Sequence, residues 1–312
     1  MLLSRSFSSF RSSTLRSPKN IHSHVARMSS IIDAARTTLS QNLGGPAHNL
    51  APDHAKFTRD DVPSQSGKVA LITGGSEGIG YGIVHTLLTK DISKVFILSL
   101  SQQVISDSVQ SIKEELGEEI ANRMVWKQCD VGDWKKVVEI ADEVKKETDR
   151  LDILVCNAAR GIMTYQLTDY GVDRHMAVNH MGHVVLTSHV LPLLKKTAEK
   201  GTVRISHQAS NAHEQTPKDT KFASLDELNT DIGPMPLYGR SKLAAILYAR
   251  YLTKHLHAQN SNILINATHP GVVETTMSTR DILEPYPIAG HLMKDAMSPF
   301  KKDQFEGAMS ML

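Results

Sequence analysis

From Lys68 onward the chain alternates short apolar runs with longer stretches of helical periodicity, and this alternation restricts the fold more than any other feature. Buried strands are predicted at 68–73, 95–98, 124–128, 151–156, 203–208 and 263–267. Helices are predicted between them at 79–88, 104–120, 134–147, 172–196 and 238–257. Continuously apolar strands are typical of parallel sheets covered by helices on both faces. Because crossover connections are right-handed, we expect an α/β fold with a single doubly wound parallel sheet.

Composition excludes several classes of function. Apolar residues make up 40% of the 312 positions and charged residues 22%, which fits a soluble globular protein with a sizeable core. A formal net charge of +2 gives no reason to expect binding to nucleic acid. No run reaches the roughly 18 to 20 apolar residues of a membrane helix. Cys129 and Cys156 have neither CxxC nor metal-ligand spacing, so we expect two buried thiols in a reducing compartment.

The first 32 residues differ from the rest of the chain. They are rich in serine and arginine and contain no acidic residue before Asp33. Such a start is typical of a mitochondrial transit peptide, so we expect import into the matrix and removal of residues 1–32. A disordered basic tail on a cytoplasmic protein is the alternative. Residues 33–65 are then expected to form an irregular extension, and residues 66–312 a single domain.

A glycine-rich turn, Thr73-Gly74-Gly75-Ser76-Glu77-Gly78-Ile79-Gly80, follows the first predicted strand and opens the first helix. Gly74 permits a tight turn, Gly78 lets the backbone approach a pyrophosphate, and Gly80 lets the helix pack closely on the strand. The N–H groups and the dipole of the new helix would then face a diphosphate. The turn therefore predicts a dinucleotide site, and a glycine turn without a ligand is the alternative.

The spacing of this turn, TGxxxGxG rather than GxGxxG, resembles that of the short-chain dehydrogenase/reductase family. Further segments resemble the other motifs of the family in the same order, and they are Cys129-Asp130-Val131, Cys156-Asn157-Ala158-Ala159, 178–183, 238–242 and 269–275. The resemblance covers the chain from about Gly67 onward and implies a Rossmann-type NAD(P)-binding domain. The start of the chain and the insertion before Tyr238 are similar to the retinol-dehydrogenase-like and WW-domain-oxidoreductase-like branch, and to the blue-light-induced mitochondrial oxidoreductase group.

The resemblance also implies which residues hold the cofactor. Asp130 would bond the adenine amino group, and the turn at 269–275 would close over the nicotinamide. The full expected set is Gly74, Ser76, Gly78, Ile79, Gly80, Ser99, Asp130, Val131, Asn157, Ala158, Tyr238, Lys242, Pro270, Gly271, Val273 and Thr275.

Tyr238 and Lys242 lie four positions apart on a predicted helix, so their side chains share one face. An ammonium beside a phenol stabilises the phenolate and lowers its pKa from about 10 toward useful acid–base strength. By resemblance, Tyr238 would exchange a proton with the substrate oxygen, Lys242 would bond the nicotinamide ribose, and Asn179 would hold a water in a relay toward Lys242. The implied reaction is hydride transfer between the nicotinamide and a carbonyl or a primary or secondary alcohol. Taken alone, the YxxxK spacing also fits an ordinary amphipathic helix.

The fourth catalytic residue is expected at the end of the fifth predicted strand. Ser206 lies within the strand, Ala209 stands at the first serine of the family's pair, and Ser210 stands at the second. Ser210 would therefore hold the substrate oxygen and stabilise its developing charge.

The end of the second strand bears on the choice between NAD and NADP. A carboxylate there would bond the ribose 2′-hydroxyl and select NAD, whereas the chain has Ser99 and Leu100. Because no acid would repel a 2′-phosphate, NADP(H) is slightly favoured over NAD(H). Glu77 opposes this choice, since NADP-preferring relatives often carry a basic residue at that position of the glycine turn.

The chain departs from the family pattern in three places. His207 and Gln208 bring polar groups into a strand that should be buried, and Ala159 replaces the last glycine of the turn after the fourth strand. The segment 307–312 resembles the helix before the family's last strand, so that edge strand is expected to be missing. The sequence therefore leaves open whether the chain is a truncated form of the protein and whether it forms a homodimer.

Other functional classes remain as alternatives. A non-catalytic NAD(P)-binding redox sensor or scaffold would keep the glycine turn but lose members of the catalytic set. An extended epimerase would need a larger segment after Thr275. His175, His180, His183 and His189 lack acidic or thiolate partners at ligand spacing, so no metal site is expected. The apolar segment after Thr275 predicts a hydrophobic carbonyl or alcohol as the small-molecule substrate.

Overall fold

The computed structural model describes residues 18–44, 47, 50–52, 56–256, 260–275, 281–286 and 301–312. Its centre is a parallel six-stranded sheet with the strand order β3-β2-β1-β4-β5-β6. The strands are β1 (Val69–Thr73), β2 (Lys94–Ser99), β3 (Met124–Gln128), β4 (Ile153–Cys156), β5 (Val203–Gln208) and β6 (Ile263–Thr268). The predicted α/β fold with a doubly wound parallel sheet is therefore confirmed.

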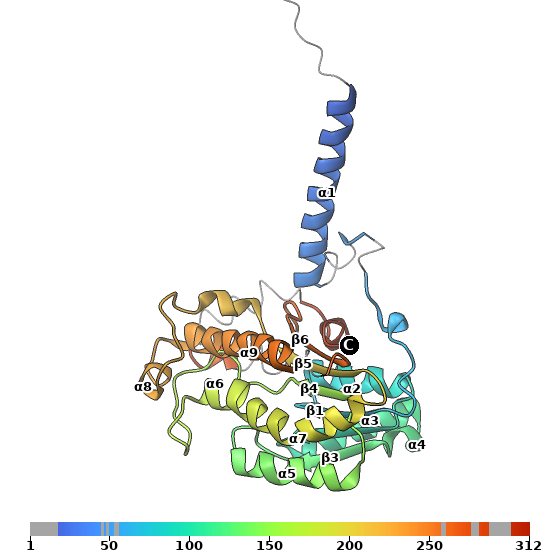
Figure 1. The fold of residues 1–312 in the computed structure, drawn as a ribbon, viewed down its shortest axis with the longest axis vertical. Coiled ribbons are helices and arrows are strands. Elements are labelled where there is room, and N and C mark those ends of the chain that lie inside the picture. The colour runs from blue at the N-terminus through green and yellow to red at the C-terminus, as the bar shows by residue number, and fades with distance from the viewer. Residues whose placement is uncertain are drawn as a thin grey trace, which may run out of the picture.

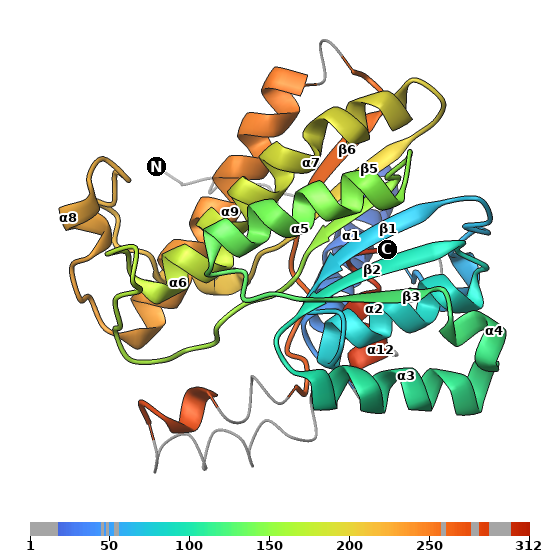
Figure 2. The same ribbon diagram turned by 90° about the horizontal axis from the view of Figure 1, so that it is seen from below.

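Helices cover both faces of the sheet (Figure 2). One face carries α5 (Trp134–Glu147), α7 (Gly182–Ala198) and α9 (Pro234–Leu256). The other face carries α2 (Gly78–Thr89), α3 (Gln102–Leu116) and α12 (Gln304–Ala308). Shorter helices lie at the rim, and they are α4 (Glu118–Ala121), α6 (Arg174–Met176), α8 (Leu225–Leu228) and the 3₁₀ turn η5 (Asn211–Gln215).

The two faces explain why the central strands are apolar throughout. Along β1, Val69 and Leu71 pack into the core beneath α5 and α7, whereas Ala70 and Ile72 pack into the core beneath α2 and α3. Successive side chains of a strand point to opposite faces, so a sheet covered on both sides needs an apolar residue at every position.

The strand order reverses between β1 and β4, which are neighbours although 79 residues lie between the end of β1 and the start of β4. From β1 the chain moves outward to β2 and β3, and from β4 it moves the other way to β5 and β6. The loops after β1 and β4 therefore diverge at the carboxyl edge of the sheet. Ligands of doubly wound sheets bind in the crevice that such a reversal opens.

Two helical predictions differ from the structure in detail. The helix predicted at 104–120 is divided into α3 and α4 because Gly117 has φ +93, a conformation that ends a right-handed helix. The helical region predicted at 172–196 contains α6, a π-helical turn at Ala177–Met181 and α7.

The N-terminal part of the description begins with a long helix, α1 (Pro18–Asn42). This helix crosses the boundary expected at residues 32 and 33, so the first ten residues of the extension predicted as irregular are helical. Residues 1–17 of the transit-like segment lie outside the described residues. Figure 1 shows α1 projecting from the domain and meeting it at its C-terminal end. Among the described helices, none combines the length and the apolar character needed to cross a bilayer.

Both cysteines lie in the core as free thiols, as predicted. Cys129 and Cys156 are each 3% exposed, and both belong to the cluster beneath α5 and α7. Burial raises the pKa of each thiol to about 12, so both are protonated at neutral pH.

Candidate active site

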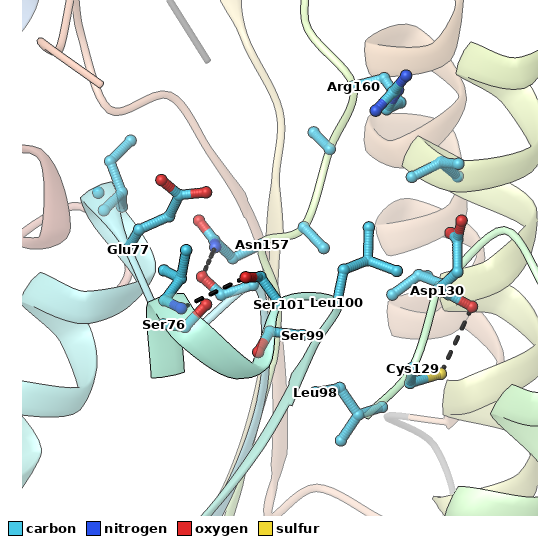
Figure 3. Close-up of a pocket in the computed structure, with 18 of the residues that line it drawn as sticks. Ser76, Glu77, Leu98, Ser99, Leu100, Ser101, Cys129, Asp130, Asn157 and Arg160 are labelled. Carbon is cyan, nitrogen blue, oxygen red and sulfur yellow. Dashed lines mark hydrogen bonds between the residues drawn. The ribbon is translucent and has the colours of Figure 1, made fainter. Parts of the chain in front are cut away.

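A pocket of about 220 Å³ lies at the carboxyl edge of the sheet, where the loops after β1 and β4 diverge. Figure 3 shows Ser76 and Glu77 of the glycine turn on one side of this pocket and Cys129 and Asp130 on the other. Most of the expected cofactor residues line it, namely Gly74, Ser76, Gly78, Ile79, Ser99, Asp130, Val131, Asn157, Ala158 and Thr275. The structure thus brings together residues from the ends of β1, β2, β3 and β4 and from the turn after β6, which are far apart in the sequence.

The glycine turn fits into its place only because three of its residues lack a side chain. Gly74 and Gly78 have φ +65 and +54, in the left-handed region that L-residues rarely adopt. A Cβ atom on Gly80 would lie 1.9 Å from the carbonyl oxygen of Gly74, which is far inside van der Waals contact. Gly80 does not line the pocket; it lets α2 pack against the turn that does.

The start of α2 suits an anionic group. The first N–H groups of a helix have no acceptor within the helix, and the helix dipole makes this end positive. Here Glu77 makes no side-chain cap, and the first turn of α2 contains no acidic residue. A diphosphate beside Gly78 would accept hydrogen bonds from these N–H groups. The residues present therefore fit a dinucleotide cofactor.

Thr73 connects the glycine turn to the turn after β4. Its hydroxyl accepts hydrogen bonds from the backbone N–H groups of Asn157 at 2.9 Å and Ala158 at 3.0 Å. The Asn157 amide donates back to the carbonyl oxygens of Thr73 at 3.0 Å and Gly74 at 3.2 Å. The Thr73 hydroxyl also lies 2.9 Å from Nε2 of His183, whose Nδ1 lies 3.2 Å from the carbonyl oxygen of Asn179.

A single form of His183 satisfies both of its contacts. Burial lowers the pKa of His183 to about 3, so the ring is neutral. Because a carbonyl can only accept, Nδ1 carries the proton and donates to Asn179, while Nε2 accepts from the Thr73 hydroxyl. The hydroxyl proton is then engaged, which leaves its lone pairs for the two backbone N–H groups. One hydrogen-bonded chain thus joins the helix that carries Asn179 to both turns of the pocket.

Thr73→Val should lower the free energy of unfolding by about 1 to 3 kcal/mol, because two backbone N–H groups lose their acceptor while the side-chain volume is nearly kept. Thermal and urea unfolding would measure this change. Thr253→Val is the matched control, since that hydroxyl donates only to Ala249 within α9. Equal stability of the two variants would show that Thr73 does not hold the turn.

The four expected catalytic residues meet beside the pocket. Tyr238 and Lys242 come from α9, and Ser210 follows β5 directly. The Ser210 hydroxyl lies near enough to the Tyr238 phenol to act on its pKa, and Nζ of Lys242 lies 5.4 Å from the centroid of the Tyr238 ring. The Lys242 ammonium donates to the carbonyl oxygen of Gln208 at 2.9 Å, and Gln208 lines the pocket.

Asn179 lies in the π-helical turn Ala177–Met181, an irregularity that is frequent at functional sites. Its amide donates to the hydroxyl of Ser241 and to the carbonyl oxygen of Arg160, both at 3.0 Å. Its carbonyl side-chain oxygen accepts from the Arg160 N–H at 2.7 Å. The side chain therefore fixes the loop after β4 against α9, next to Tyr238 and Lys242.

Burial dominates the protonation of the central pair. It raises the pKa of Tyr238 to about 12, although the nearby Ser210 hydroxyl acts in the opposite direction. It also lowers the pKa of Lys242 to about 8, because the side chain is only 2% exposed. The prediction that the pKa of Tyr238 is lowered is wrong for the protein chain by itself, since loss of hydration outweighs the opposing effect of Ser210.

Lys242→Met should stabilise the protein by on the order of 1 to 3 kcal/mol at pH 7, because a buried charge is removed. Between pH 8 and 10.5 the folded wild-type chain binds fewer protons at Lys242 than the unfolded chain, so wild-type stability rises with pH. The advantage of the variant should therefore shrink over this interval. Urea unfolding of both proteins at pH 7 and 10 measures it, and a difference that is independent of pH would contradict the buried charge.

The turn expected to close over the nicotinamide is only partly in the pocket. Thr275 lines it, and a Cβ on Gly78 would meet the Thr275 side chain at 3.0 Å. Pro270 is buried and Gly271 half-buried, but neither lines the pocket. Val273 packs into the core beneath α2 and α12, so it supports the turn from behind.

Sequence reasoning missed several residues of the pocket. Arg160 and Asp281 line it, and the Asp281 carboxylate accepts from the Gly161 N–H at 2.9 Å. Arg174 also lines it, with its guanidinium 3.8 Å from the Asp130 carboxylate. The arginines carry no motif, although Arg160 directly follows the recognised turn after β4. Gln208 could have been found, because an amide side chain in a predicted buried strand is unusual. The structure explains it, since Gln208 lines the pocket.

The histidines considered as metal ligands have other partners or lie apart. His175 contacts the carbonyl oxygen of Gly161 at 3.0 Å, and His183 is engaged as described. Among the described residues no three histidine, cysteine, aspartate or glutamate side chains are grouped as a metal site would require.

Known proteins resemble this chain over most of its length. It is 54% identical over 292 residues to a Neurospora crassa protein named bli-4 and described as a candidate mitochondrial oxidoreductase, which covers 92% of this chain and 70% of that protein. It is 34% identical over 226 residues to the Colletotrichum higginsianum short chain dehydrogenase/reductase dpchH, covering 69% of this chain but only 56% of that one. Human polyprenol dehydrogenase is 27% identical over 251 residues, covering 78% of this chain and 73% of the human protein.

Solved structures repeat the fold. A short chain dehydrogenase from Burkholderia cenocepacia J2315 in complex with NADP is 26% identical, with a TM-score of 0.57 over 78% of this chain and 88% of that one. A short chain dehydrogenase/reductase from Burkholderia phymatum in complex with NAD is 18% identical, with a TM-score of 0.60 over 79% and 85%. The family model described as short chain dehydrogenase matches residues 68–217. The chain therefore belongs to the short-chain dehydrogenase/reductase family of NAD(P)-dependent oxidoreductases.

Proposed function

We propose that this protein transfers a hydride between NAD(P)(H) and a carbonyl compound or a primary or secondary alcohol, with Tyr238 as the general acid and base. One observation carries the proposal. Ser210 and Tyr238 lie close together beside Lys242, and Lys242 is hydrogen-bonded to the carbonyl oxygen of Gln208, which lines the dinucleotide pocket. Proton-transfer groups and the nucleotide site are thus adjacent.

Each residue has a role that its environment supports. Ser210 would hold the substrate oxygen, and Tyr238 would give it a proton during reduction or take one during oxidation. The raised pKa keeps Tyr238 protonated at neutral pH, which is the form that serves as an acid. Lys242 would turn from the Gln208 carbonyl toward the nicotinamide ribose, and Asn179 would support the relay behind it. When bound, the nicotinamide supplies or receives the hydride.

We propose a slight preference for NADP(H) over NAD(H). After β2 the chain offers the hydroxyls of Ser99 and Ser101, and neither residue can repel a 2′-phosphate. The Ser99 hydroxyl accepts from the indole of Trp126 at 3.0 Å, so it is held in place. Glu77 also lines the pocket and acts against a phosphate. Related structures contain either nucleotide, so the ratio of the two dissociation constants is the quantity to measure.

A hydrophobic substrate fits the segment that follows Thr275. Its described part, residues 281–286, contains Leu283, Pro285 and Tyr286. Glu284 holds this segment to the loop after β4 through the Thr164 N–H at 2.9 Å and through the Thr164 hydroxyl. Polyprenol dehydrogenase among the relatives supports an apolar alcohol or carbonyl compound.

We place the protein in the mitochondrial matrix after removal of residues 1–32. The acid-free, arginine-rich start supports this location, as does the word mitochondrial in the name of the Neurospora relative. Cell fractionation with N-terminal sequencing of the recovered chain tests it. An intact N-terminus in the cytoplasmic fraction would refute it.

The function is tested by titrating the purified full chain with NADPH and NADH, using nicotinamide fluorescence, and then by assaying a panel of apolar carbonyl compounds. Binding followed by oxidation of one nucleotide, lost in Tyr238→Phe, is the expected result. Binding with no turnover on any compound would favour a redox sensor over an enzyme. Failure to bind either nucleotide would refute the proposal.

A further inference from the structure

Three segments that are distant in the sequence meet beside the active site. They are the end of α1 at residues 41–44, the turn at 269–274 and the segment 301–303. In Figure 1 this junction is where α1 reaches the domain. Nothing in the motifs of the family predicts a role for α1, since the resemblance begins at about Gly67.

The last carbonyl groups of α1 are capped by the other two segments. The Asn42 carbonyl oxygen accepts from the Val272 N–H at 2.8 Å, and the Gln41 carbonyl oxygen accepts from the Lys302 ammonium at 2.7 Å. Residues 301–303 in turn pair with the turn, because the Lys302 N–H donates to Val272 at 2.8 Å and the Glu274 N–H donates to Lys302 at 2.9 Å. The carbonyls at a helix end otherwise need water or a cap, so this end of α1 is integrated into the domain.

The turn is shaped for this contact. Gly271 has φ +85, and a Cβ atom on it would lie 2.7 Å from the carbonyl oxygen of Gln41 and 2.9 Å from that of Asn42. Any larger residue would push α1 away. The end of the helix therefore lies directly on the Pro270-Gly271 step.

His269 extends the contact to the catalytic serine. Its Nε2 lies 3.0 Å from Oδ1 of Asn42, and its Nδ1 accepts from the Asn211 N–H at 3.4 Å. Asn211 directly follows Ser210. The Asn42 amide donates to the carbonyl oxygen of Thr38 at 2.7 Å, and this bond orients Oδ1 toward His269.

The chemistry of the ring agrees with both contacts. Burial, followed by the nearby Lys302 charge, lowers the pKa of His269, so the ring is neutral at neutral pH. A neutral imidazole has one donor and one acceptor nitrogen. With the proton on Nε2, it donates to Asn42 and accepts from Asn211 at the same time.

We infer that Asn42 and His269 are positioning residues: the end of α1 fixes the turn over the nicotinamide and, through His269, the corner that carries Ser210. This inference rests on the proposed function, because the turn can affect catalysis only if a nicotinamide binds next to it. It also limits processing of the leader, which must leave Gln41 and Asn42 on the mature chain. Removal of residues 1–32 satisfies that limit.

The test uses the full chain with Asn42→Ala, which removes the acceptor of His269, and Asn42→Asp, which keeps an oxygen there. Gln110→Ala is the matched control, because that exposed amide bonds only Glu114 on α3. Without nucleotide, hydrogen exchange of the peptide 269–275 should become faster in Asn42→Ala only. With nucleotide, its KM for the cofactor should rise about tenfold with a smaller change in kcat, the loss expected for one hydrogen bond. Asn42→Asp should stay within about threefold of wild type.

His269→Phe is the second variant, since it keeps the ring volume but breaks both bonds. It should raise the cofactor KM and also lower kcat, because the Ser210 corner is released as well. Exchange and KM values in Asn42→Ala equal to those of Gln110→Ala would overturn the inference while leaving the proposed function intact. A wild-type chain that binds neither nucleotide would instead overturn the proposed function.

Discussion

Tyr238→Phe should lower kcat by about 10²-fold or more and leave the dissociation constant of the nucleotide within about twofold of wild type. The phenol is the group that carries the transferable proton, and it lies near the Ser210 hydroxyl. Phenylalanine keeps the ring in contact with Lys242 and so preserves the packing of α9. Single-turnover kinetics with excess enzyme would separate the chemical step from product release.

Tyr251→Phe is the control for this prediction. Tyr251 lies on the same helix, is 55% exposed and stacks on Tyr248 away from the pocket. It should leave both kcat and nucleotide binding unchanged. Turnover by Tyr238→Phe comparable to that of Tyr251→Phe would remove Tyr238 from the mechanism and direct attention to another proton donor.

Gly80→Ala should abolish nucleotide binding and lower the free energy of unfolding by about 1 to 3 kcal/mol or more. The new methyl group would lie 1.9 Å from the Gly74 carbonyl oxygen and 2.8 Å from Nδ2 of Asn157. Because both atoms belong to turns held by Thr73, neither can move without disturbing the other. Fluorescence titration with NADPH and thermal unfolding would measure the two effects.

Gly201→Ala separates this steric effect from the general cost of replacing glycine. Gly201 precedes β5, and a Cβ there would meet no atom within 4 Å. This variant should bind nucleotide like wild type and be equally or more stable, since alanine restricts the unfolded chain. Unimpaired binding by Gly80→Ala would mean that the glycine turn can open. The close packing of α2 on this turn would then not be required for nucleotide binding.

Local pattern was sufficient to predict the sheet. The apolar runs predicted at 68–73 and 95–98 coincide with β1 and β2 to within one residue, because strands buried on both faces are apolar at nearly every position. The glycine turn and the Tyr238–Lys242 pair were recognisable for a related reason, since each depends on spacing within one element. The structure adds that the Tyr238–Lys242 pair lies beside the pocket lined by the glycine turn, with Lys242 hydrogen-bonded to Gln208 at its wall.

Features that depend on contacts between distant segments could not be predicted. The expectation that the pKa of Tyr238 is lowered was wrong because spacing gives proximity but not burial, and burial dominates here. The end of α1 contacts a turn more than 220 residues away, with Asn42 and His269 separated by 227 positions. His183 looked like one of four unassigned histidines, and only the fold shows that it bonds both Thr73 and Asn179.

The reactivity of the two buried thiols can be used to measure how often the structure around each of them opens. Cys129 lines the nucleotide pocket, whereas Cys156 lies inside the core, and the chain contains no other cysteine. A maleimide or disulfide reagent reacts with thiolates, so it can modify either residue only after the surrounding structure has opened. The labelling rate of Cys129 would then measure local opening of the pocket, and the labelling rate of Cys156 would measure global unfolding. A nucleotide that slows the first more than the second would reveal its binding site without any catalytic assay.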